Sequence, residues 1–316
     1  MDKLNKRAVV FTFIIVVLLS IIIISFLVNL SHRTSGSKIQ STNIKIETLN
    51  SFVKNLNSSY LPDALRVSSH KAMISLLDYE ANNTYVDNIN DYFKQVLNNG
   101  YYNNIKQQDM FQDGLNYTLL NSLNEIKNLA NQQGTIFEHS RIDFSTLTSN
   151  QTDPWHVIMG LKITYNIKDT SNEVFWNISN REIYTNLNVY DYRDPIYLVE
   201  QEPGLSLIIT KIPYNPAYFS DITNFNNHIQ RGNFTNNPLA PSFIQRLQGD
   251  FKKQGFTLTS NGIESLLNPG SYPNPQSYSN ADYQFYNKIN GLCVRDMPAN
   301  FKLDQSHINY YNRVNC

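Results

Sequence analysis

An uncharged apolar run near the N-terminus constrains this chain more than any other feature of its sequence. Residues 8–30 read AVVFTFIIVVLLSIIIISFLVNL and contain no Asp, Glu, Lys or Arg. An α-helix of this length reaches roughly 34 Å, enough to cross a hydrocarbon core about 30 Å thick. A cleaved secretory signal has a shorter apolar stretch and a small-x-small cleavage site, which residues 29–32 (NLSH) do not supply. We therefore expect an uncleaved transmembrane helix over residues 8–30.

The charges on either side of this run indicate its orientation. Lys3, Lys6 and Arg7 precede the run, whereas Arg33 and Lys38 follow it. Because Lys and Arg are enriched on the cytoplasmic side of membrane helices, this bias favours a cytoplasmic stub at residues 1–7. We expect a single-pass protein of the cell membrane whose C-terminal domain is extracellular.

The step from Arg7 to Ala8 offers an alternative fate for the N-terminus. A basic residue followed by a small one is similar to the cleavage site of prepilins. In those proteins Gln or an aromatic residue often follows the cut, and a Glu lies a few residues into the helix. Here Val9 and Val10 follow, and the run contains no Glu. We expect an uncut N-terminus, with prepilin-like processing as the alternative.

The charge balance narrows the class of partner. The chain has 26 Lys and Arg against 26 Asp and Glu, with a pI near 7.0. The chain has no excess of basic residues of the kind that indicates a nucleic-acid partner. The residues after the apolar run are numerous enough to bury a core without metal or disulfide support. The partners that the sequence indicates are the lipid bilayer, through residues 8–30, and other surface or pilus-like subunits.

The two cysteines both lie near the C-terminus, at Cys293 and Cys316. In an oxidising compartment such a pair can form a disulfide, which we favour over two unpaired thiols. The bond would close a loop of about 24 residues and stabilise the fold by about 3 kcal/mol in the chain-entropy description. Two cysteines exclude a zinc site with four cysteine ligands.

Helical periodicity dominates the first half of the chain. A polar linker starts at residue 31, and apolar residues then recur at spacings of three and four, which predicts a linker and stalk helix within residues 31–60. Further helices are predicted at residues 62–79, 86–97 and 109–131, with Pro62 at the start of the first. Each has one apolar face, so together they form a helical layer over residues 61–134.

After the helical layer, the apolar residues recur at every second position, which is the spacing of a β-strand. In residues 157–167 every second residue is apolar and the residues between them are mostly polar, with Ile158 and Gly160 as the exceptions, so this segment is the clearest predicted strand. Turn residues follow at 169–172. The other predicted strands are residues 135–147 at an edge, 174–178, 183–189 and 205–209. Region 135–316 therefore holds an antiparallel sheet of four to six strands with a mixed C-terminal region.

That C-terminal region shows weaker signals. Ser242 begins a predicted short helix at residues 243–247, a helical turn is predicted at residues 261–267, and residues 269–279 read as a loop. We expect an α+β fold in which helices pack on the antiparallel sheet, with residues 61–134 and 135–316 in one globular unit.

Several short segments occur in a fixed order after the apolar run. They are DPW at 153–155, Trp176, DPIY at 194–197, PSFIQRLQGD at 241–250, GIESL at 262–266, ADYQFY at 281–286 and FKLDQSH at 301–307. In this order they resemble uncharacterised archaeal membrane-anchored surface proteins with an N-terminal pilin-like helix. The resemblance covers about residues 40 to 311. It implies an archaeal cell-surface protein and brings no catalytic residue with it.

No sequence motif identifies a reaction. The chain lacks a zinc-protease helix, a nucleophile elbow and both glycine-rich phosphate loops, so we assign no cofactor, no metal ligand and no catalytic residue. The weak candidates are Asp304 and His307, three residues apart on one helix face, with Glu264 or Asp282 nearby in space. The favoured alternative is that Asp304 caps a short helix and Glu264 satisfies donors at a helix start.

Aromatic residues leave two roles open. Trp155 and Trp176 flank the predicted hairpin, where we expect them in the sheet core, although exposed rings would indicate a binding surface. The Tyr-rich stretch at 272–286 could form a carbohydrate-binding face. The leading hypothesis is a structural or assembly role at the cell surface. The alternatives are an extracellular binding module for glycan or peptide, and a surface hydrolase.

Overall fold

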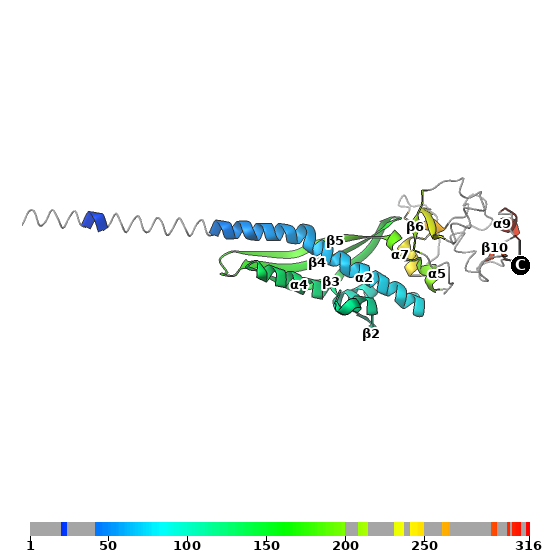
Figure 1. The fold of residues 1–316 in the computed structure, drawn as a ribbon, viewed down its shortest axis with the longest axis horizontal. Helices are drawn as coiled ribbons and strands as arrows, with labels where there is room; N and C mark the ends of the chain where they lie inside the picture. The colour runs from blue at the N-terminus through cyan, green and yellow to red at the C-terminus, as the bar shows by residue number, and fades with distance from the viewer. Residues whose placement is uncertain are drawn as a thin grey trace, which may run out of the picture.

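The computed structural model shows an α+β fold in which helices pack against an antiparallel sheet (Figure 1). It describes residues 20–23, 42–199, 208–213, 231–236, 241–249, 261–265, 292–295, 302–303, 305–310 and 314–316. The predicted fold class is confirmed in this coarse form.

A long helix leads into the domain. Residues 42–55 are helical and continue through a π-helical turn, η1 (Leu56–Tyr60), into α2 (Leu61–Asn82). Residues 42–82 therefore form a rod of roughly 60 Å. The helix predicted for the stalk is therefore present over the described residues. It does not stand apart from the domain, because Leu49 and Leu56 are buried in the domain core.

Only part of the N-terminal apolar run is described. Residues 20–23 are helical, and Ile21, Ile22 and Ile23 each expose more than half of their surface. The rest of the predicted transmembrane helix lies outside the described residues. Among the residues that are described, no helix combines the length and apolar character needed to cross a bilayer.

The helical layer departs from prediction in one place. α3 (Ile89–Asn99) begins at an Asn88 cap and ends at Gly100, close to its predicted bounds. The single helix predicted over residues 109–131 is wrong, because the segment divides into a 3-10 helix, η2 (Gln108–Gly114), and α4 (Leu119–Gln132). Asp113 and Gly114 adopt positive φ angles of 57° and 74°, which end helical geometry. Leu115, predicted to face inward, is 57% exposed.

Three long strands make the main sheet. β3 (Thr135–Asp153), β4 (His156–Asp169) and β5 (Phe175–Asn188) pair antiparallel in that order. The strand predicted at 157–167 is confirmed as β4, and its alternate apolar side chains are buried. The strands predicted at 174–178 and 183–189 are one strand with a register shift, where Asn180 has a φ of 52°.

Within the described residues this sheet has three strands, whereas four to six were predicted. The strand expected at 205–209 is described only from residue 208, where Ile208 bridges Arg193. β6 (Thr210–Lys211), β7 (Asn233–Asn236) and β8 (Ile263–Ser265) form a separate mixed sheet. The helical turn predicted at 261–267 is therefore wrong at β8, where buried Ile263 pairs with Asn236.

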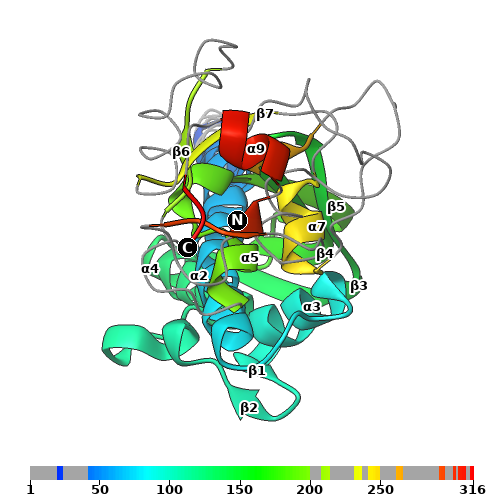
Figure 2. The same cartoon turned by 90° about the vertical axis from the view of Figure 1, so that its right-hand side faces the viewer.

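The core lies between the helices and one face of the sheet. In Figure 2, α2 and α4 lie to one side of the three strands, and α3 lies beside α2 on the side nearer β3. Leu65, Met73 and Leu76 of α2 are fully buried, as are Phe93 of α3 and Tyr165 of β4. Small hairpin strands β1 (Tyr101–Tyr102) and β2 (Ile105–Lys106) extend from the helical layer.

A buried ion pair joins two short helices beyond the sheet. α5 (Pro195–Val199) follows Asp194, and α7 (Phe243–Leu247) begins at Ser242 with a capping box, as the serine predicted. The Arg246 guanidinium lies 2.5 Å from the Asp194 carboxylate, and both side chains are fully buried. Because a buried charge needs a partner, this pair fixes α7 relative to the end of the main sheet.

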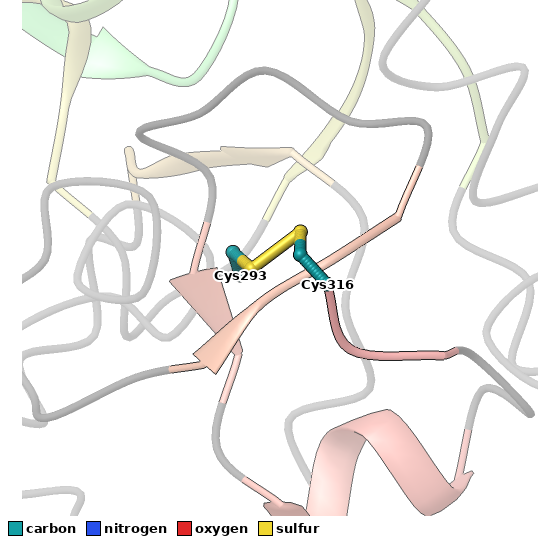
Figure 3. The surroundings of a disulfide bond; sticks show 2 residues. All are labelled: Cys293 and Cys316. Atoms are coloured by element: carbon teal, nitrogen blue, oxygen red, sulfur yellow. A yellow bond between two sulfur atoms is a disulfide. The ribbon is translucent and has the colours of Figure 1, made fainter.

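The predicted disulfide between Cys293 and Cys316 is present (Figure 3). Their Cα atoms lie 5.5 Å apart, and the Cys316 N–H donates to the Cys293 carbonyl at 3.3 Å. Cys293 belongs to β9 (Leu292–Cys293), which pairs with β10 (Lys302–Leu303), and α9 (Gln305–Tyr310) follows. The bond holds the chain's last residues against β9.

Candidate functional site

A groove between α2 and the end of β5 is the best candidate site in the described part of the chain. It encloses about 540 Å³, within the range of about 300–1,000 Å³ that is usual for ligand sites. Its lining comes from α2, from β5, from the one-turn helix η3 (Val189–Asp191), and from Tyr192 and Ile208.

The α2 wall is cationic. Arg66, Val67, His70 and Lys71 lie on one face of the helix because they repeat over one turn. The Arg66 guanidinium lies 3.1 Å from the Asp63 carboxylate on the same exposed surface. Lys71 donates to the Gln112 side chain at 2.7 Å and lies over the Tyr117 ring. Two permanent positive charges therefore border the groove on this side.

The opposite wall is polar and aromatic. Asn186 and Asn188 come from the end of β5, while Tyr190 and Asp191 come from η3. Tyr190 is 38% exposed, so its ring is available to a ligand. Ile208, which is 57% exposed, adds an apolar flank.

A hydrogen bond connects the two walls. His70 Nδ1 lies 2.8 Å from the Tyr192 hydroxyl. Burial raises the pKa of Tyr192, so its hydroxyl keeps its proton at any physiological pH. Burial also lowers the pKa of His70, and the nearby Asp191 carboxylate acts in the opposite direction. This pair of neutral rings holds α2 at a fixed position beside β5.

The candidate residues from the sequence lie elsewhere. Glu264 lies in β8 and His307 in α9, whereas Asp304 and Asp282 lie outside the described residues. The helix-start role for Glu264 is wrong, because its segment is a strand. α9 begins directly after Asp304, where a capping residue would stand. The hydrolase hypothesis therefore stays a prediction. Within the described ranges, no group of three or more His, Cys, Asp or Glu is arranged to hold a metal ion.

The two tryptophans differ in how far their side chains are buried. Trp155 is 7% exposed, as predicted for the sheet core. Trp176 is 39% exposed, so its core prediction is wrong. It lies near the hairpin end of β5, at the sheet edge, where neighbouring Phe175 is also exposed. The Tyr-rich stretch at 272–286 lies outside the described residues.

The groove was not predicted from the sequence. The only available signals were three basic residues on the polar face of α2 and an alternating pair of Asn residues at the end of β5. Residues 66–71 and 186–192 are too far apart in sequence for any motif to join them. Their pairing depends on how α2 crosses the sheet.

No protein-family model, no curated protein and no solved structure matches this chain. The resemblance to archaeal anchored proteins therefore stays a prediction. The fold and the groove define an α+β domain with a groove lined by cationic, polar and aromatic side chains.

Proposed function

We propose that the chain is a single-pass, membrane-anchored extracytoplasmic protein with a structural or assembly role at the cell surface. The helix over residues 42–82 carries this proposal. This helix begins at residue 42, only 12 positions after the end of the apolar run, and its Leu49 and Leu56 are buried in the domain core, so the domain lies close in sequence to the proposed anchor. Residues 8–30 would cross the bilayer, with residues 1–7 cytoplasmic.

Two further features support this placement. Residues 20–23 of the apolar run are helical and expose their isoleucines, as a lipid-facing helix does. The Cys293–Cys316 disulfide is typical of proteins outside the reducing cytoplasm. An archaeal surface and pilus-like partner subunits belong to the same proposal.

Fractionation tests the anchor. The full chain is expected in the membrane pellet after alkaline carbonate washing, and protease added outside intact cells should digest the domain. A double variant, Val17→Arg with Ile22→Arg, should release the protein, because each charge at a helix centre costs about 2.5–3.5 kcal/mol. Wild-type protein in the soluble cytosolic fraction would refute the anchor.

Intact-mass measurement separates the pilin-like route from the simple anchor. Loss of the first seven residues supports pilin-like assembly, and a retained Met1 or Asp2 refutes that processing without affecting the anchor. The anchor is tested by fractionation alone.

We also propose a second role, as an extracellular binding module for a glycan or peptide. The groove beside β5, with the exposed Tyr190 ring, favours it. Tyr190→Ala should weaken ligand binding, whereas Tyr184→Ala should not. Tyr184 is 54% exposed on β5 but does not line the groove, so the same substitution there is the control.

A further inference from the structure

We propose that the groove takes an extended peptide, which adds to the edge of β5 as a further strand and turns carboxylate side chains toward α2. This inference rests on the proposed binding role and names its ligand class. It follows from the direction of the β5 main chain, the charge of the α2 wall and the composition of the strand edge.

The pairing of β5 with β4 fixes which main-chain groups point outward. The Val189 N–H donates to the Trp155 carbonyl at 2.9 Å, and the pairing continues in regular register from Asn188 opposite His156. In an antiparallel ladder, alternate residues direct both main-chain groups to the same neighbour. Leu187 and Val189 therefore face β4, and the alternate residues, Glu182, Tyr184, Asn186 and Asn188, face away from it.

The outward groups meet no further strand in the described structure. β5 stands at the edge of the sheet order β3-β4-β5. The edge from residue 182 to residue 188 is roughly 20 Å long, and Asn186 and Asn188 lie in the groove. Proteins usually blunt such edges with charges or proline. Here Glu182, paired with Lys162, stands at the far end of the edge, and residues 183–188 (IYTNLN), which lead to the groove, contain neither. This edge is open to strand addition.

The spacing of these groups favours a peptide over a sugar. Asn186 and Asn188 each present one donor and one acceptor, repeated every two residues, or about 7 Å. An extended peptide repeats the complementary pair at the same interval, whereas sugar hydroxyls have no such fixed repeat.

Charge complementarity favours acidic side chains in that peptide. Arg66 and Lys71 border the groove, and Asp191 is the opposing charge among its lining residues. The Arg66 side chain is 56% exposed, and because its surface pair with Asp63 is weakened by the surrounding water, a ligand carboxylate can replace Asp63.

Selection from a display library tests the inference. The full chain in detergent micelles is the bait, and random dodecapeptides are the probe. We expect enrichment of peptides that combine β-branched and acidic residues. Fluorescence anisotropy then gives the Kd of the best peptide. Arg66→Gln should raise that Kd several-fold at low salt, and the effect should shrink as salt rises.

Paired substitutions at one position separate main-chain from side-chain recognition. Asn186→Pro should raise the Kd at least tenfold, because it removes an outward N–H, and it should leave the β4 ladder intact. Asn186→Ala should change the Kd less than threefold. Circular dichroism and Tm establish that each variant folds. If the proline variant does not fold, a peptide N-methylated at its central residue should lose the same affinity for wild-type protein.

The results separate the peptide inference from the proposed binding role. Equal losses for Asn186→Ala and Asn186→Pro overturn strand addition. Binding of a tetragalacturonate without any enriched peptide overturns the peptide inference but keeps the binding role. Binding of neither probe overturns both.

Discussion

A buried acid at the end of α2 gives the most quantitative prediction. The Glu80 side chain is fully buried, and its Oε1 accepts the Val86 N–H at 3.3 Å. Its Oε2 has no hydrogen-bond partner among the described residues. Burial raises the pKa of Glu80 from 4.5 to about 9, and the Val86 hydrogen bond opposes the rise only weakly.

The sign of the pH dependence follows from this shift. Between pH 4.5 and about 9, folded Glu80 keeps a proton that the unfolded chain releases. The free energy of unfolding therefore falls as pH rises through that window. Each pKa unit corresponds to about 1.4 kcal/mol, so Glu80 removes about 3 kcal/mol by pH 7 and about 6 kcal/mol by pH 9.

The assay compares wild type with Glu80→Gln, whose side chain does not ionise. Guanidinium unfolding of the full chain in micelles, followed by tryptophan fluorescence, gives the free energy at half-unit steps from pH 5 to 8.5. At pH 5 the variant should be less stable by about 1–3 kcal/mol, because its amide donors lack partners. As the pH rises, the free energy of unfolding of the variant should increase relative to that of wild type by about 1.4 kcal/mol per pH unit, so the variant becomes the more stable protein.

The control isolates Glu80 from other groups. Glu125→Gln makes the same change at an exposed carboxyl on α4, and it is measured beside Glu80→Gln as the control variant. Tyr92, buried nearby, has a raised pKa because of burial, so its hydroxyl does not ionise in this range. A flat difference between wild type and Glu80→Gln would show that Glu80 is hydrated or ionised in the folded state, and the reasoning would fail.

Three further predictions concern stability. Asp194→Ala should cost about 3–5 kcal/mol in chemical unfolding, because it leaves the Arg246 charge buried without its carboxylate; a loss under 1 kcal/mol would contradict the buried pair. Cys293→Ser should lower the unfolding free energy by about 3 kcal/mol or less, and wild type should take up iodoacetamide only after reduction. Gly100→Ala should cost at least about 1 kcal/mol in thermal unfolding, since Gly100 has a φ of 79° and an added Cβ would meet the Phe111 ring; an unchanged Tm would refute this contact.

Local periodicity predicted the elements that have one buried face. β4 alternates because its helix-facing side chains are all in the core, and the bounds of α3 follow from its cap and from Gly100. The break between η2 and α4 escaped prediction, because apolar residues continue at helical spacing across the left-handed turn at Asp113.

Features that depend on long-range packing were not predictable from local pattern. Ile263 looks like the start of a helical turn, yet its pairing with Asn236 makes it strand. The groove joins the polar face of α2 to a sheet edge, and no short motif encodes that crossing. The disulfide was predictable because the chain has only two cysteines.

The π-helical turn decides how the long helix responds to a change in chain length. Leu56 and Leu61 are both fully buried although they are five residues apart, a spacing that an α-helix would turn to different sides. The turn absorbs one surplus residue and so keeps both halves of the apolar stripe on the sheet. Deleting exposed Ser58 should restore ordinary four-residue spacing, whereas one deletion between Leu65 and Met73 would rotate Arg66 and its neighbours by about 100° relative to the following turns. The long helix should therefore accept the loss of one residue at η1 without turning its buried stripe away from the sheet.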